Sequence, residues 1–132
     1  MIDHVNAIAL TVRNVRVCAE FYRDMLGLKV DMMNDDEAYL TLPQKGAPIL
    51  AIIGAAGLAK ELPAERIRPK ELPLNRNYIA VFIEDADKEY EHLRKKGVKF
   101  LQPPATRPNG QRYAFFEDPE GNLWEISHFP KE

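Results

Sequence analysis

Few side chains in this sequence carry chemistry, and a glutamate near the C-terminus stands out. Glu125 lies within Leu123–Phe129, a segment predicted to be a strand. Burial would raise the pKa of such a carboxyl group and suit it to general acid–base catalysis. The alternative is a carboxylate that a neighbouring hydroxyl or cation satisfies, from Thr11, Tyr78 or Arg112.

The three histidines are the other candidates for acid–base or metal chemistry. His92 falls on a predicted helix and His4 precedes the first predicted strand. His128 is three residues from Glu125, so strand alternation turns the two side chains to opposite faces. We expect surface or capping histidines. A β-bulge would reverse the parity of His4 or His128, which keeps a histidine metal ligand open.

Two arginines in the segment 102–112 are candidates for anion binding. Arg107 and Arg112 would bind a carboxylate or phosphate bidentately if they converge on it. Solvated arginines are the alternative, and we favour it for this polar, proline-rich segment.

A strand–helix pattern that occurs twice must position these side chains. An apolar strand leads through a polar cap into an amphipathic helix, first at residues 8–27 and again at 79–97. The predicted caps and closing glycines are Asn14 and Gly27 in the first copy and Asp85 and Gly97 in the second. Such duplication sets the fold and directs attention to equivalent positions of the two copies.

Three further strands follow each helix. Their predicted bounds are Leu28–Met33, Ala38–Leu42 and Ile49–Ile53, then Val98–Leu101, Tyr113–Phe116 and Leu123–Phe129. Each copy is therefore a βαβββ module, and the chain is α+β. We predict one domain over residues 1–132, with module 1 at about 5–54, a linker at about 55–77 and module 2 at about 78–129. The linker is expected to hold one helical turn near Leu58–Leu62.

Alternation along the first strand of each copy defines a face without a helix. Ile8, Leu10 and Val12 are expected to pack on the helix, which leaves Ala7 and Thr11 on the other face. Aromatic residues accompany that face, so we expect a pocket for a flat or apolar small molecule. The predicted ligand-binding residues are Ala7, Thr11, Tyr39, Tyr78, Phe82, Arg112, Tyr113, Phe115 and Glu125.

The bulk composition excludes several classes of function. The 132 residues carry a net charge of −2 with both signs interleaved, so no basic stripe for nucleic acid is present. Cys18 is the single cysteine, which excludes an intrachain disulfide and favours a reducing cytoplasm. The N-terminus lacks the pattern of a signal peptide, and no apolar run is long enough for a membrane span.

Two motifs carry a family resemblance. Residues 21–28, FYRDMLGL, and 116–125, FEDPEGNLWE, resemble conserved segments of the glyoxalase I/bleomycin-resistance/extradiol-dioxygenase superfamily, also called the vicinal oxygen chelate fold. The resemblance covers nearly the whole chain. It implies paired βαβββ modules with curved sheets around a cleft, and a homodimer. It also implies a divalent metal (Zn, Ni, Mn or Fe) in the members that are enzymes.

The resemblance implies four metal-ligand positions in this sequence. They fall on Ala7, on Leu50 or Ala51, on Tyr78 and on Glu125. Alanine and leucine have no donor atom, and a tyrosine ligand must lose a proton with a pKa near 10. Glu125 is the only retained candidate, whereas a catalytic metal wants about three protein ligands. We therefore expect no metal.

Three functional hypotheses follow. The preferred one is a metal-free homodimer that binds a small, partly apolar or aromatic molecule in the cleft. The second is a metal-dependent lyase, isomerase or dioxygenase that uses Glu125 as one ligand. The third is a non-catalytic interaction domain whose cleft is filled by side chains.

Overall fold

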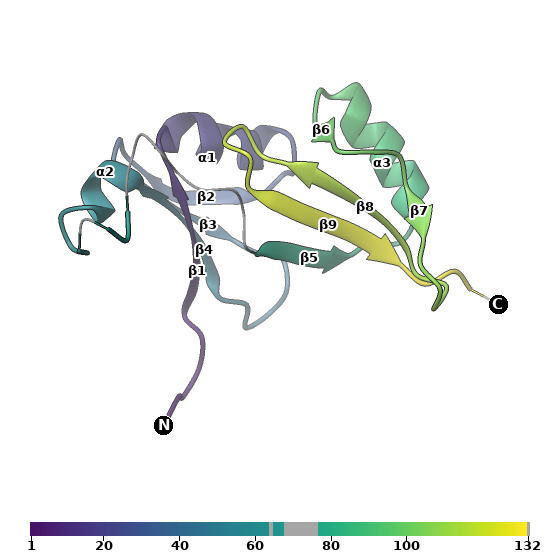
Figure 1. The fold of residues 1–132 in the computed structure, drawn as a ribbon, viewed down its shortest axis with the longest axis horizontal. Coiled ribbons are helices and arrows are strands. Elements are labelled where there is room, and N and C mark those ends of the chain that lie inside the picture. The colour runs from purple at the N-terminus through teal and green to yellow at the C-terminus, as the bar shows by residue number, and fades with distance from the viewer. Residues whose placement is uncertain (64, 68–76, 132) are drawn as a thin grey trace. The chain divides into compact units, whose positions relative to one another are not determined.

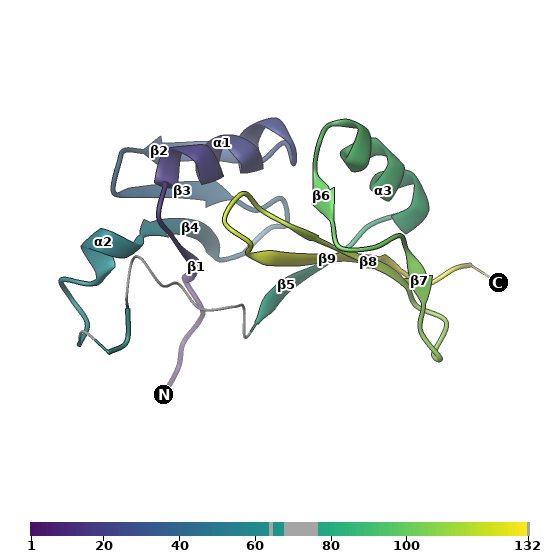
Figure 2. The same ribbon diagram turned by 45° about the horizontal axis from the view of Figure 1, so that its top comes forward.

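The computed structural model describes residues 1–63, 65–67 and 77–131. The chain forms two compact units, Met1–Pro73 and Leu74–Glu132, and each contains its own sheet and its own principal helix (Figures 1 and 2). Each unit contains the strands and the helix of one copy of the predicted module. That the two units form one domain around a shared cleft stays a prediction.

The first unit has a four-stranded mixed sheet in the order β1-β4-β3-β2. Strands β1 and β4 are parallel, and the other neighbours are antiparallel. The elements are β1 (Ala7–Val12), α1 (Val15–Asp24), β2 (Lys29–Met33), β3 (Glu37–Thr41), β4 (Ile49–Gly54) and α2 (Ala55–Leu58). The predicted βαβββ order is confirmed for this copy.

Helix α1 begins and ends as its sequence predicts. The Asn14 side chain accepts a hydrogen bond from the Val17 N–H at 3.1 Å, which satisfies one free donor of the first turn. Gly27 follows the helix with φ +72°, a conformation that costs glycine little. Cys18 and Tyr22 are fully buried on the side of the helix that packs on the sheet.

The second unit repeats this plan and adds a strand. Its elements are β5 (Tyr78–Phe82), α3 (Ala86–Lys95), β6 (Lys99–Phe100), β7 (Ala105–Thr106), β8 (Arg112–Glu117) and β9 (Leu123–His128). The order is β5-β9-β8-β6, with β7 also paired to β8. The sequence did not predict β7, because a two-residue strand carries no recognisable period.

The sheet of the second unit has one face covered by α3 (Figure 2). Trp124 and Ile126 of β9 are buried there, and the Phe116 ring stacks on Trp124 at 6.2 Å between centroids. Asp85 caps α3 by accepting hydrogen bonds from the backbone N–H groups of Asp87 and Lys88. The alternate residues of β5 and β9 therefore lie on the face without a helix.

The predicted linker begins with helix rather than with an irregular segment. Helix α2 starts at Ala55 directly after β4, three residues before the predicted turn near Leu58–Leu62. Residues 64 and 68–76 of the linker lie outside the described residues. No helix in the described part of the chain is long and apolar enough to cross a membrane.

Candidate functional site

Glu125 is a buried carboxylate on the helix-free face of the second sheet. It lies in the middle of β9 and is 4% exposed. In register, its neighbours are Ala80 on β5 and Phe115 on β8. A buried charge needs a partner, since desolvation without one is costly.

The partner of Glu125 is Arg107, which follows β7. An Arg107 Nη2 group donates to Glu125 Oε2 at 2.6 Å, and the arginine side chain is 30% exposed. The hydrogen bond to Glu125 is the main cause that raises the pKa of the Arg107 guanidinium above its ordinary value. The sequence prediction proposed Thr11, Tyr78 or Arg112 for this role, and the described contacts give it to Arg107 instead.

A glutamine extends the ion pair into a four-residue network. Arg107 Nη1 donates to Gln111 Oε1 at 2.7 Å, and Gln111 Nε2 donates to Ser127 Oγ at 3.0 Å. Ser127 is two residues from Glu125, so both side chains belong to one face of β9. The network Glu125–Arg107–Gln111–Ser127 therefore joins two residues of β9 to two residues of the turn between β7 and β8.

Aromatic rings border this polar network. The Arg107 guanidinium carbon lies 4.0 Å from the centroid of the Tyr113 ring, a cation–π contact. Phe115 makes edge-to-face contacts with Tyr113 and with Tyr78, at 5.9 and 5.1 Å between centroids. Three of the predicted pocket aromatics thus form one cluster.

A hollow of about 80 Å³ opens beside the network. It is lined by Ala80, Val81, Phe82, Gln111, Glu125 and Ser127. Phe82 is 75% exposed at the edge of this hollow, and its ring lies 6.3 Å from that of Phe129 between centroids. Pockets for drug-sized ligands measure about 300–1,000 Å³, so this hollow suits a small polar group rather than a whole drug-sized ligand.

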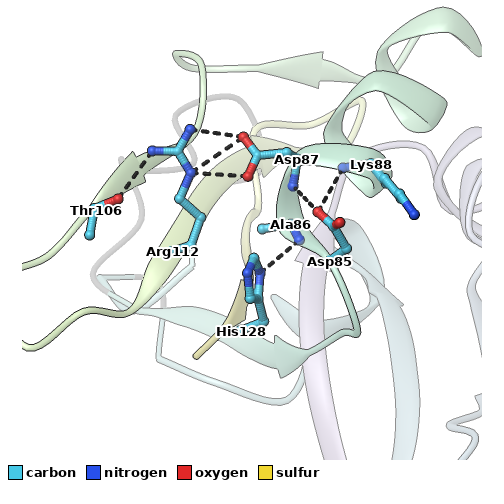
Figure 3. Close-up of polar contacts among 7 residues, drawn as sticks. All are labelled: Asp85, Ala86, Asp87, Lys88, Thr106, Arg112 and His128. Atoms are coloured by element: carbon cyan, nitrogen blue, oxygen red, sulfur yellow. Dashed lines mark hydrogen bonds and ion pairs between the residues drawn. The ribbon is translucent and has the colours of Figure 1, made fainter. Parts of the chain in front are cut away.

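Arg112 lies on the other face of the sheet and does not join this cluster. Its guanidinium donates to both carboxylate oxygens of Asp87 in α3, with 2.8 Å from Nη2 to Oδ1, and Nη1 donates to Thr106 (Figure 3). Strand alternation is the reason, because Arg112 pairs with His128 whereas Tyr113 pairs with Ser127. Arg112 therefore ties α3 to β8.

The histidines behave as surface or capping residues, as predicted. His128 Nδ1 accepts a hydrogen bond from the Ala86 N–H at 2.8 Å and so caps the start of α3 (Figure 3). A hollow of about 530 Å³ adjoins it, lined by Glu84, Asp85, Lys88 and Glu89 and by residues 128–131. His4 and His92 are exposed.

The helix-free face of the first unit carries the other predicted pocket residues. Ala7 and Thr11 are half-buried on β1. The Tyr39 hydroxyl donates to Glu37 Oε2 at 3.0 Å, which is the main cause of a raised pKa for Tyr39. Their contribution to a ligand site stays a prediction.

A family model decides the affiliation of the chain. The model described as Glyoxalase/Bleomycin resistance protein/Dioxygenase superfamily matches residues 2–126. The chain belongs to this superfamily. The resemblance that the two sequence motifs carry is thereby confirmed.

Similar proteins cover 90% or more of the chain. The chain is 32% identical over 121 residues to the uncharacterized protein YraH of Bacillus subtilis, covering 90% of this chain and 93% of YraH. It is 25% identical over 132 residues to metallothiol transferase FosB of Staphylococcus saprophyticus, covering 96% of this chain and 77% of FosB. A crystal structure of a superfamily enzyme from Burkholderia phytofirmans has the same fold, with a TM-score of 0.78 at 14% identity, and covers 95% of this chain and 98% of that one.

The strand registers show which of the metal-ligand positions that the resemblance implies are equivalent between the two sheets. Ala9 pairs with Ala51 in the first sheet, and Ala80 pairs with Glu125 in the second. Ala9 and Ala80 occupy the same position in the repeated first strand. Their partners are therefore equivalent, and Ala51 rather than Leu50 is the counterpart of Glu125. Its methyl group offers no donor atom.

The residues present do not fit the metal that superfamily enzymes carry. The Glu125 carboxylate is engaged by the Arg107 guanidinium, and its counterpart is Ala51. Among the described residues, no three His, Cys, Asp or Glu side chains gather in a way that would hold a metal ion. A catalytic metal needs about three protein ligands.

Sequence reasoning missed Arg107 as the partner of Glu125, together with Gln111 and Ser127. Alternation along β9 was sufficient to place Ser127 beside Glu125. The signal for Arg107 was the Asn109-Gly110 turn, which follows it and folds the segment back toward β8. Arg107 was identified as a candidate anion clamp but was expected to be solvated.

Proposed function

We propose that this chain is a metal-independent small-molecule-binding protein of the superfamily that acts as a homodimer. Its ligand is a small, partly aromatic molecule with an uncharged polar group. The observation that carries the proposal is the hollow beside Glu125, where a neutral ion pair meets an exposed aromatic side chain.

The charge balance supports an uncharged polar group. Arg107 and Glu125 cancel one another, so a cationic group would compete with the guanidinium and an anionic group would face the carboxylate. Ser127 and Gln111 line the same hollow and supply hydroxyl and amide groups for hydrogen bonds.

The aromatic residues support a flat ligand body. Phe82 and Tyr78 are exposed at 75% and 52%, and Phe115 joins Tyr78 to the cluster. Exposed rings beside a few polar groups are typical of small-molecule sites. This arrangement favours ligand binding over an interaction domain with a filled face.

The similarity to metallothiol transferase FosB favours a second candidate, a metal-dependent transferase or related enzyme. In that case Glu125 would have to leave Arg107 and find further ligands, including any from a second copy of the chain. The residues described here argue for the first proposal.

The test is binding of small aromatic fragments. We would record ¹H–¹⁵N spectra of labelled protein with phenol, benzamide and benzylamine, and native mass spectra of protein purified without denaturation. Phenol or benzamide is expected to shift the amide signals of Ala80, Phe82 and Ser127, and the charged benzylamine is not. No shift with any fragment and no retained molecule would contradict the proposal.

A further inference from the structure

We propose that the Arg107 guanidinium takes the place of a divalent cation at Glu125. The negative charge of Glu125 is then balanced by a side chain of the same protein rather than by a bound metal ion. The inference deepens the proposed function, since it names the residue that makes a metal unnecessary. The family resemblance implies that superfamily enzymes bind their metal at the position of Glu125, and here a guanidinium of the same chain lies 2.6 Å from that carboxylate.

The guanidinium is held from three sides. Nη2 donates to Glu125, Nη1 donates to Gln111, and the Tyr113 ring lies against the guanidinium at 4.0 Å. A planar guanidinium that is fixed by two hydrogen bonds and a ring face is a positioned cation rather than a solvated one.

The backbone also prepares Arg107 for this position. The Arg107 N–H donates to the Gln111 carbonyl at 2.9 Å, and the Gly110 N–H donates to the Arg107 carbonyl at 2.9 Å. Both backbone polar groups of Arg107, its N–H and its carbonyl, are thus hydrogen-bonded within the turn that follows β7. The backbone of Arg107 is therefore already ordered, and the entropy that its side chain loses on reaching Glu125 is that of its own rotamers.

The register neighbours of Glu125 on the two adjacent strands offer a metal no side-chain donor. These neighbours are Ala80 and Phe115, which have no donor atom in their side chains. The hydroxyl of Ser127 already accepts from Gln111. A metal ion at Glu125 would also lie close to the positive charge of Arg107, which disfavours it.

The experiment combines metal analysis with a double-mutant cycle. Protein purified without chelators would be offered Zn²⁺, Ni²⁺, Mn²⁺ and Fe²⁺, desalted and analysed for metal. Unfolding in urea would be measured for Arg107→Gln, Glu125→Gln and the double variant. Arg94→Gln is the matched control, because Arg94 forms an exposed ion pair with Glu91.

The unaltered chain is expected to retain far less than one metal ion per molecule. Each single substitution at the pair is expected to lower the ratio of folded to unfolded protein about tenfold, since it leaves a charge or a polar group without its partner. The double variant should lose little more than either single variant. Arg94→Gln should change the ratio by less than about threefold.

Two results would overturn the inference. The first is near-stoichiometric metal in the unaltered chain that disappears in Glu125→Gln. The second is full additivity in the cycle, which would show that Arg107 and Glu125 are not coupled. If Arg107→Gln does not fold, Arg107→Met replaces it, because methionine keeps an unbranched side chain and removes the positive charge and the hydrogen bond to Glu125. A metal-free protein with a coupled pair that binds no fragment would contradict the proposed function and leave this inference standing.

Discussion

Arg112 donates hydrogen bonds to both carboxylate oxygens of Asp87, and this contact ties β8 to the first turn of α3. The side chains of Asp87 and Arg112 are 52% and 31% exposed, so solvent screens the pair. The hydrogen bond that the Asp87 carboxylate accepts from Arg112 is the main cause of the lowered pKa of Asp87.

This ion pair predicts an acid-sensitive contribution to stability. A lowered folded-state pKa means that the contribution is complete above the unfolded value of about 3.9 and is lost as pH falls through the folded value. Asp87→Asn is expected to cost about 0.5–1 kcal/mol at pH 7, a small figure because solvent screens the exposed pair, and progressively less as pH falls below about 3.9. Urea unfolding of the unaltered chain and of the variant, at pH 7 and at a pH below about 3.9, measures this difference in the free energy of unfolding. Asp3→Asn, in the exposed N-terminal segment, should cost nothing at either pH.

His128 is predicted to stabilise α3 through its bond to the Ala86 N–H. Removing the acceptor in His128→Ala leaves a helix-start donor without its protein partner, at a cost of about 1 kcal/mol in the free energy of unfolding. His92→Ala is the control, because His92 is exposed on the same helix and should shift stability by less than about 0.5 kcal/mol. Equal effects of the two substitutions would refute the capping role.

Phe82 and Phe116 are predicted to separate binding from stability. Phe82 is 75% exposed at the hollow, whereas Phe116 is 1% exposed in the core. Phe82→Ala should leave stability nearly unchanged and abolish the amide shifts that phenol or benzamide cause. Phe116→Ala should lower the free energy of unfolding by about 3–5 kcal/mol. Undiminished fragment binding by the Phe82 variant would argue against the proposed site.

The fold was predictable because its determinants are local and repeated. Asn14 and Asp85 cap their helices as predicted, and Gly27 and Gly97 take positive φ after them. Such caps depend on residues within one turn, so a single sequence carries them.

The candidate site was less predictable because its contacts join residues distant in sequence. Glu125 was identified, but its partner Arg107 is 18 residues away and depends on a turn, a short strand and their register. Arg112 was assigned to the wrong face because its segment had no predicted strand to set its parity. Side-chain direction in a hairpin follows from register, which single-sequence patterns fix poorly.

Gly110 is predicted to be required for the turn that positions Arg107. Its φ is +92°, a conformation that an L side chain rarely adopts, and apart from its chain neighbours no described atom lies within 4 Å of the place where a Cβ would be. Gly110→Ala should therefore cost about 1–2 kcal/mol through backbone strain alone. Gly57→Ala is the matched control, because Gly57 also has open space but lies in α2 without positive φ, and alanine should stabilise it by up to about 1 kcal/mol.

The two glycine variants also test the link between the turn and the ion pair. If the turn positions Arg107, then Gly110→Ala should reduce the coupling between Arg107 and Glu125 in the double-mutant cycle, because the guanidinium no longer starts from a fixed backbone. Gly57→Ala should leave that coupling unchanged, since it lies in the other unit. Urea unfolding of the cycle in each glycine background measures both. Coupling that survives Gly110→Ala in full would mean that Glu125 and Tyr113 hold the guanidinium without help from the turn.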